Sequence, residues 1–318
     1  MGFRKSAWNR VNFSLGPYGR RGSTQATAMA LSRSSVLYNS HALLRKPYNI
    51  KPGSIADVAT GWPYIAPQKA KKVTNGSSAH VVERLRDQLY QMYGDLQEVR
   101  RGAKTKGEAI FVLGDSRNRQ DIIENEIVDL VFTSPPYLNN YDYSDRTRLK
   151  MYFWGEANNW SDITQKVRTG LIMSATTQVV RSEYIKGNLL SNDFCHTVPD
   201  LALELKPKIE ELTQRRLQKG GKKSYDIMVA GYFNDMLKVF QEMFRVLKPG
   251  GAFVLILGDS APYGVHILTD MYLGEVGKAI GFARYTIEDL RTCGGKWKDN
   301  PQRHKVALKE SILTLEKN

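Results

Sequence analysis

Apolar residues are scattered through the first part of the chain and patterned through the rest. Up to about residue 105 the sequence is rich in Arg, Lys, Ser, Asn and Gly, and a regular apolar pattern first occurs at residues 81–96. The apolar positions of that stretch recur at spacings of three and four, which predicts an amphipathic helix. They are Val82, Leu85, Leu89, Met92 and Leu96. A further helix is expected at residues 24–44.

From residue 108 onwards short apolar runs alternate with amphipathic stretches. The runs at residues 109–113 and 127–133 are followed by Gly-Asp and Ser-Pro-Pro-Tyr. Their unbroken apolar character favours parallel strands that are buried on both faces, with a brief helix or turn between them. The later elements expected are a helix at 232–247 that stops at Lys-Pro-Gly, a strand at 252–260, a helix at 270–280, and apolar segments at 282–290 and 310–317.

This order of elements predicts an α/β fold, an open and mostly parallel sheet with helices on its faces. Residues 150–225 are mixed and polar and interrupt the alternation, so they are interpreted as an insertion. The expected division is a basic, mostly helical extension at 1–105, a catalytic domain at 106–149 and 226–318, and an inserted region at 150–225 that recognises DNA.

The charge of the chain points to a polyanionic partner. Lys and Arg total 46 against 32 for Asp and Glu, a net charge of +14. Such an excess attracts nucleic acid, although a merely basic or ribosome-associated protein has the same balance. The two cysteines and five histidines show no ligand spacing, so neither a metal site nor a disulfide is expected. Without a signal peptide or a long apolar span, a cytoplasmic protein is predicted.

The strongest chemical signal is the sequence Thr133, Ser134, Pro135, Pro136, Tyr137 at the end of an expected strand. Open α/β sheets bind ligands at the carboxyl ends of their strands. Prolines lack an N–H group, so they leave backbone carbonyls free to accept hydrogen bonds. A hydroxyl, a free carbonyl and an aromatic ring together suit an aromatic amine, which can be oriented by two acceptors while its ring stacks on tyrosine.

On these residues the chain resembles the amino-methyltransferases with an (Asp/Asn/Ser)-Pro-Pro-Tyr motif, and most closely the TSPPY group of cytosine-N4 and adenine-N6 DNA methylases. The resemblance extends over residues 133–155, 247–260 and 308–315, and covers roughly 105–318. It implies a Rossmann-like fold that uses S-adenosylmethionine. The catalytic residues implied are Ser134, Pro135, Pro136 and Tyr137, and the cofactor contacts implied are Gly114, Asp115, Ser116 and Thr133.

The glycine-rich cofactor turn of that family, an Asp-Pro-Phe-x-Gly-x-Gly type, does not occur in the sequence. The nearest candidate, residues 56–61 with Asp57, has one glycine where two or three are expected. The resemblance therefore favours a split enzyme, in which a second polypeptide supplies this turn. Asp259, at the end of the strand expected at 252–260, is equally compatible with a cap or turn and with contact to the target base.

In the family that the chain resembles, the adenine enzymes more often carry Asp or Asn before Pro-Pro-Tyr, so the resemblance favours cytosine N4 over adenine N6. Two rival interpretations are a methyltransferase for RNA or for a protein glutamine, and an inactive DNA-binding subunit whose methyltransferase fold has decayed. Double-stranded DNA of a prokaryotic or phage host is the expected substrate. The insertion carries the expected DNA contacts, which are Arg168, Arg181, Arg215, Arg216, Lys222 and Lys223.

Overall fold

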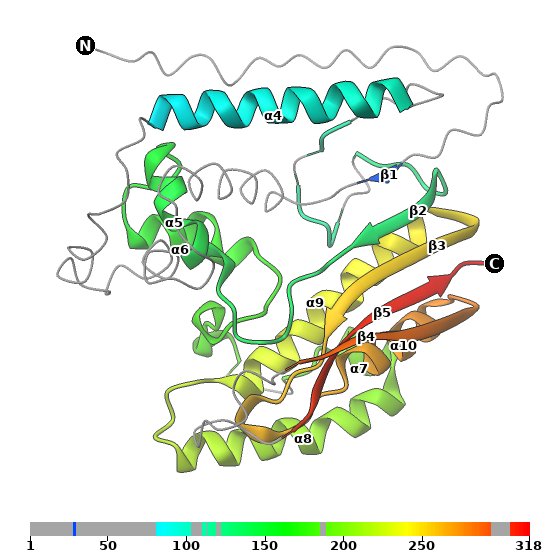
Figure 1. The fold of residues 1–318 in the computed structure, drawn as a ribbon. Helices are drawn as coiled ribbons and strands as arrows, with labels where there is room; N and C mark the ends of the chain where they lie inside the picture. Colours follow the sequence, from blue (N-terminus) through cyan, green and yellow to red (C-terminus); the bar gives the residue numbers. More distant parts are fainter. Residues whose placement is uncertain are drawn as a thin grey trace.

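The computed structural model describes residues 28–29, 81–102, 110–112, 114–118, 122–184, 189–293 and 306–318. In that part of the chain, one mixed sheet has the strand order β1-β2-β3-β5-β4 (Figure 1). The strands are β1 (Ala28–Met29), β2 (Val128–Thr133), β3 (Leu247–Gly258), β4 (Arg284–Cys293) and β5 (Leu308–Glu316). The helices are α4 (Val81–Gly102), α5 (Tyr143–Phe153), α6 (Trp160–Lys166), α7 (Asn192–Thr197), α8 (Pro199–Gln218), α9 (Tyr225–Val246) and α10 (Thr269–Ile280).

The α/β class is confirmed, and the regular helices and strands of the second half lie close to where the sequence predicts them. The prediction of a mostly parallel sheet is wrong for the half of the sheet that β3, β5 and β4 form. Strands β1, β2 and β3 are parallel, but β5 runs antiparallel to both β3 and β4. The reason is that β4 and β5 follow one another in the chain and lie side by side, so they pair as an antiparallel hairpin.

The core lies between the sheet and helices α9, α10 and α8. Phe240 of α9 packs on Phe253 of β3, with ring centroids 5.0 Å apart. Helix α10 lies so close to β5 that a side chain at Gly277 would collide with Leu315. Helix α8 packs on α9, so the inserted region shares this core. Its buried positions are Leu201, Ala202, Leu205, Ile209 and Leu212.

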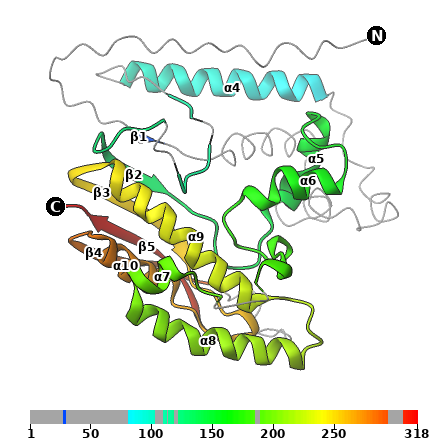
Figure 2. The same ribbon diagram turned by 180° about the vertical axis from the view of Figure 1, so that it is seen from behind.

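The opposite face of β2 is open. Leu130 and Phe132 alternate with buried Val131 along the strand and are exposed, Phe132 to 56%. The prediction that this strand is buried on both faces is therefore wrong, because the helices that pack on the sheet in the described part cover one face of it (Figures 1 and 2). Val254 and Ile256 continue the open face along β3 and are half-buried.

The strand expected at residues 109–113 is also wrong in its described part, residues 110–112. Ile110 and Phe111 are exposed and form no strand, and the outer edge of β2 pairs instead with Ala28 and Met29. An apolar run becomes a strand only where a neighbouring strand accepts its hydrogen bonds. The helix expected at 24–44 lies outside the described residues apart from those two, and the 56–61 segment lies wholly outside them. None of the described helices combines the length and apolar character needed to cross a membrane.

Candidate active site at the carboxyl ends of the parallel strands

Two parallel strands end side by side and carry the predicted catalytic residues. Thr133 of β2 pairs with Leu255 of β3, so the residues that follow both strands emerge at the same edge of the sheet. After β2 the chain continues in irregular conformation, with Ser134 exposed, Pro135 buried and Pro136 half-buried. This is the edge where open α/β sheets bind ligands.

Tyr137 is held from two sides. Its hydroxyl donates to Oε1 of Glu310 on β5 at 2.6 Å, and its ring lies over Gly258, where a side chain would approach two ring carbons to 3.4 Å. Burial and the hydrogen bond to Glu310 raise the pKa of Tyr137 to about 12, although the side chain of Ser134 acts in the opposite direction. The phenol is therefore neutral at physiological pH and acts as a donor.

Glu310 is itself fixed by a cation. Nε of Arg291 on β4 lies 2.5 Å from Oε2 of Glu310, while Oε1 accepts from Tyr137. The hydrogen bond from Tyr137 and the charge of Arg291 hold the pKa of Glu310 below its usual value against the effect of burial. A chain of three side chains from β4, β5 and the loop after β2 thus fixes the tyrosine ring. Residues 308–315 belong to the resemblance, but no sequence pattern indicated a role for Glu310.

Asp259 directly follows Gly258, the residue against which the ring of Tyr137 lies. It is buried, and its Oδ2 lies 3.0 Å from Nε2 of His266, while its Oδ1 has no hydrogen-bond partner among the residues that the structure describes. A two-way backbone bridge between Ser260 and Ile267 returns the chain and places His266 beside Asp259. The residue therefore has one buried carboxylate oxygen to spare, beside the predicted catalytic strand.

The surroundings of Asp259 disfavour the ionised form of its carboxyl group. Burial raises the pKa of Asp259, and the nearby carboxylate of Asp270 adds to the effect, while His266 and Lys309 act against it. Asp270 is almost fully buried. Its carboxylate accepts a hydrogen bond from the hydroxyl of Ser311 at 2.8 Å and forms an ion pair with Lys309 at 3.0 Å. These contacts tie α10 to β5 directly behind the site.

The loop after Tyr137 fastens the inserted region to the catalytic strand. Asn140 has the left-handed φ of 61°, and its Oδ1 accepts from the backbone N–H and hydroxyl of Thr176, at 2.8 and 3.0 Å. Asp142 accepts from Thr177 at 2.7 Å and from Arg168 at 3.1 Å. Burial alone would raise the pKa of Asp142, but these contacts and the hydroxyl of Ser144 lower it overall.

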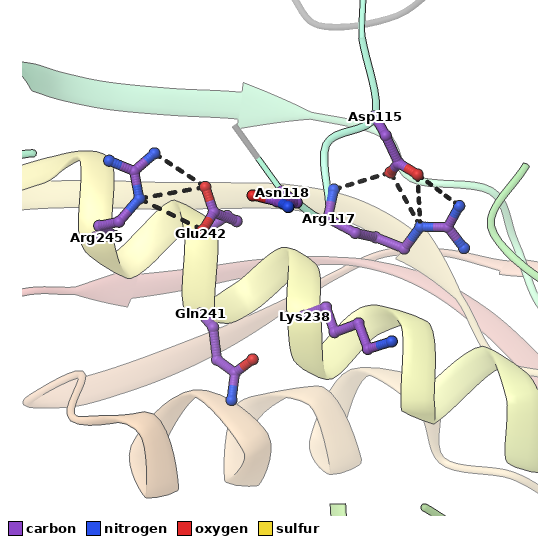
Figure 3. Close-up of a pocket in the computed structure, with 7 residues that line it drawn as sticks. All are labelled: Asp115, Arg117, Asn118, Lys238, Gln241, Glu242 and Arg245. Atoms are coloured by element: carbon purple, nitrogen blue, oxygen red, sulfur yellow. Dashed lines mark hydrogen bonds and ion pairs between the residues drawn. The ribbon is translucent and has the colours of Figure 1, made fainter. Parts of the chain in front are cut away.

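The Gly-Asp turn predicted to contact the cofactor has different neighbours from those of Tyr137. Gly114 and Asp115 are exposed and Ser116 is half-buried, and Asp115 accepts from Nε of Arg117 at 2.9 Å. Arg117 also donates a hydrogen bond from Nη1 to Oδ1 of Asp235 on α9, again at 2.9 Å. Figure 3 shows Asp115 and Arg117 at one end of an open pocket of about 730 Å³ and Glu242 paired with Arg245 at the other. The contacts described link this turn to α9, and its role toward a cofactor stays a prediction.

The predicted DNA contacts fall into two groups. The four arginines have partners within the chain. Arg168 is buried and pairs with Asp142, Arg181 donates to Ser224 and two backbone carbonyls, Arg215 pairs with Glu211, and Arg216 pairs with buried Asp226. Lys222 and Lys223, by contrast, are exposed. DNA binding by either group stays a prediction.

Sequence comparison relates the chain to methyltransferases. It is 26% identical over 250 residues to Type II methyltransferase M.BsoBI of Geobacillus stearothermophilus, which covers 76% of this chain and 49% of that protein. It is 28% identical over 159 residues to Type II methyltransferase M.AvaI of Nostoc sp., covering 50% of this chain and 32% of that protein. The chain thus spans half or less of the length of the relatives it matches. These relatives confirm the resemblance to DNA methyltransferases. No protein-family model matches the chain.

Among solved structures, TTHA0409 of Thermus thermophilus, described as a DNA modification methylase and complexed with S-adenosyl-L-methionine, is 17% identical. The match covers 64% of this chain and 54% of that one, with a TM-score of 0.28. This score is too low to establish a common fold.

Proposed function

We propose that this chain is the catalytic part of a DNA methyltransferase that transfers a methyl group from S-adenosylmethionine to N4 of cytosine in a specific sequence, as in restriction-modification. One observation carries the proposal. Residues 134–137 follow β2 at the ligand-binding edge of the sheet, with Tyr137 fixed on β3 by Glu310, in a chain related to Type II methyltransferases. A cytoplasmic setting in a bacterium or phage is part of the proposal, and the bacterial origin of the relatives supports it.

The proposed chemistry is that of orienting a weak nucleophile. The lone pair of an exocyclic amine is delocalised into the base, so the nitrogen attacks poorly. The hydroxyl oxygen of Ser134 and the carbonyl oxygen of Pro135 accept hydrogen bonds from the two N–H groups of the amine. These hydrogen bonds turn the nitrogen lone pair out of conjugation with the base. Tyr137 stacks on the base once it has been flipped from the duplex. The chain needs no strong base, because the methylated nitrogen is cationic and loses its proton readily.

Glu310 is assigned a positioning role in this scheme. Stacking requires the ring of Tyr137 to keep one plane, and a phenol that donates to a fixed carboxylate cannot rotate freely. The absence of a side chain at Gly258 lets the ring lie directly on the strand. Asp259 follows immediately, so its buried and unpartnered oxygen is the next acceptor along the same strand end.

The described residues that are predicted to contact the cofactor do not fit a whole S-adenosylmethionine molecule by themselves. Thr133 stands at the strand end, but both carboxylate oxygens of Asp115 already accept hydrogen bonds from Arg117. S-adenosylmethionine supplies an electrophilic methyl group when it is bound. We therefore assign the glycine-rich turn and its acidic partner residue to a second polypeptide.

The open face of β2 is the surface proposed for that partner. A parallel sheet in an α/β protein is normally covered on both faces, and Leu130 and Phe132 remain exposed on this one. The occupant proposed is the strand and helix that carry the glycine-rich turn. The match covers 49% of M.BsoBI and 32% of M.AvaI, and the remaining length provides room for such a unit in those proteins.

The experiment is to supply tritiated S-adenosylmethionine and DNA to the chain, with and without a partner that carries the glycine-rich turn, and then to identify the methylated nucleoside by mass spectrometry. N4-methylcytosine is expected with the partner. N6-methyladenine would instead support the adenine substrate. DNA binding without any methylated nucleoside, in the presence of the partner, would support an inactive DNA-binding subunit.

A further inference from the structure

Helix α4 exposes the apolar side of its sequence pattern. Leu89, Met92, Leu96 and Val99 are between 42% and 66% exposed. The contrast with α9 is sharp, because the apolar positions of that helix are buried. A row of large apolar side chains along a helix is stabilised by contact with another element, and in the described part of the chain α4 has no extensive packing partner.

The spacing of this row is that of a coiled coil. From residue 82 to residue 99 the apolar positions alternate strictly between steps of three and four, which places Val82, Leu89 and Leu96 at position a of a heptad and Leu85, Met92 and Val99 at position d. A helix that packs on a sheet normally has a broader apolar stripe than a strict a and d seam. The 22 residues of α4 accommodate three such repeats.

We propose that α4 is a dimerisation helix that pairs in parallel with α4 of a second copy of this chain. The flanking charges decide the orientation. In a parallel pair, position g of one helix meets the next position e of the other, which brings Asp95 next to Arg100 of the second copy twice in each dimer. In an antiparallel pair the e positions face one another, which would bring Arg86 towards Arg100. The parallel arrangement therefore joins opposite charges, and the antiparallel one joins like charges.

The first test is the mass of the whole chain in solution, measured by sedimentation equilibrium between about 1 and 50 μM. A dimer is expected, and a monomer or a trimer over this range overturns the proposal. Leu89→Asp with Leu96→Asp introduces two charges at position a and is expected to abolish the dimer. The matched control, Tyr90→Asp with Gln97→Asp, introduces the same charges at the same spacing on position b and is expected to leave the dimer intact. Equal effects of the two pairs contradict the assigned seam.

The second test addresses orientation and does not depend on whether the Leu89 and Leu96 variant keeps its helix. Asp95→Arg and Arg100→Asp should each weaken the dimer about tenfold, since each turns two attractive contacts into repulsive ones. The double variant should restore it. In a background lacking Cys195 and Cys293, Leu96→Cys should form a disulfide between copies and Gln97→Cys should not. A dimer without the Leu96→Cys disulfide refutes the parallel pairing.

Discussion

The ring of Tyr137 is the best-defined predicted catalytic group, because two contacts from outside its own loop fix its plane. Tyr137→Ala is expected to lower the methylation rate at least about 100-fold in the partnered enzyme, through loss of the stacking surface. Tyr137→Phe keeps the ring and loses only its tether, so a loss of about tenfold is expected. The rate is measured as kcat on a DNA substrate. A wild-type rate in Tyr137→Ala removes the catalytic assignment.

Glu310→Ala separates the positioning role from a general effect on folding. It should reproduce the Tyr137→Phe defect, and the double variant Tyr137→Phe with Glu310→Ala should be no slower than either single one, because both remove the hydrogen bond between the Tyr137 hydroxyl and Glu310. Multiplied defects in the double variant would mean that Glu310 acts on something other than Tyr137.

Ser134→Ala is a separate prediction at the same site. Ser134 is exposed, so its replacement should leave the melting temperature unchanged while removing one of the two acceptors for the amine. The expected loss in kcat is at least about 100-fold. A rate within twofold of wild type would mean that the carbonyl of Pro135 orients the amine alone.

Asp259 provides a test based on pH. Its folded pKa is raised, so the contribution of the neutral carboxyl to stability is full below the unfolded value and is lost as the pH rises through the folded pKa. Asp259→Asn removes this loss. The melting temperature of Asp259→Asn minus that of the wild type should therefore increase as the pH is raised from about 4 to 8.

Glu310→Gln is the control with the opposite sign. The pKa of Glu310 is lowered in the fold, so its carboxylate stabilises the protein above the unfolded value, and that stabilisation is lost as the pH falls through the folded pKa. Glu310→Gln should consequently destabilise the protein at neutral pH and approach the wild type in acid. A parallel pH trend in both variants would contradict the two opposite environments.

The sequence could show that residues 133–137 follow a strand, but it could not show what holds them. Tyr137 and Glu310 are 173 residues apart, and they meet only because β5 inserts between β3 and β4. Strand order is set by packing over the whole sheet and leaves no local pattern. His266 was assigned no role for a similar reason, since its contact with Asp259 depends on a backbone bridge rather than on ligand spacing.

At the scale of elements, periodicity located α9, α10, β3 and β5, each of which contributes buried apolar residues to a single core. It failed at the run expected over residues 109–113, where Ile110 and Phe111 are exposed. An apolar run records a tendency to be buried, and the tendency is met only where a partner element exists. The exposed Phe111 and Phe132 are two results of that limit.

The inserted region allows a paired test of DNA binding. Lys222 and Lys223 are exposed, so replacing both by Ala should flatten the slope of log K against log salt by about two and leave the melting temperature unchanged. Arg216 pairs with a buried carboxylate at 2.9 Å, so Arg215→Ala with Arg216→Ala should mainly lower the melting temperature. An unchanged slope in the lysine variant would identify these residues as a solvated surface.

At the scale of the whole molecule, the open face of β2 and the missing glycine-rich turn concern the same part of a methyltransferase. In the proposed enzyme the turn and its acidic residue hold the methionine and ribose of the cofactor, while Thr133 and Asp115 stay the predicted cofactor contacts of the described chain. Each charge-assisted contact that is absent is worth ~1.5 to 3 kcal/mol, so the loss of two or three should weaken cofactor binding by a factor of hundreds or more.

Calorimetry on the purified chain is therefore expected to show little or no binding of S-adenosylmethionine at micromolar concentrations, and binding should appear when a partner with the glycine-rich turn is added. Phe132→Asp should abolish this gain, because it places a charge on the apolar face proposed for the partner, whereas Lys278→Asp, at an exposed position on α10, should preserve it. Micromolar binding by the chain alone would contradict the split enzyme. Loss of that binding in Asp57→Ala would then identify residues 56–61 as the cofactor turn, and the open face of β2 would need a different occupant.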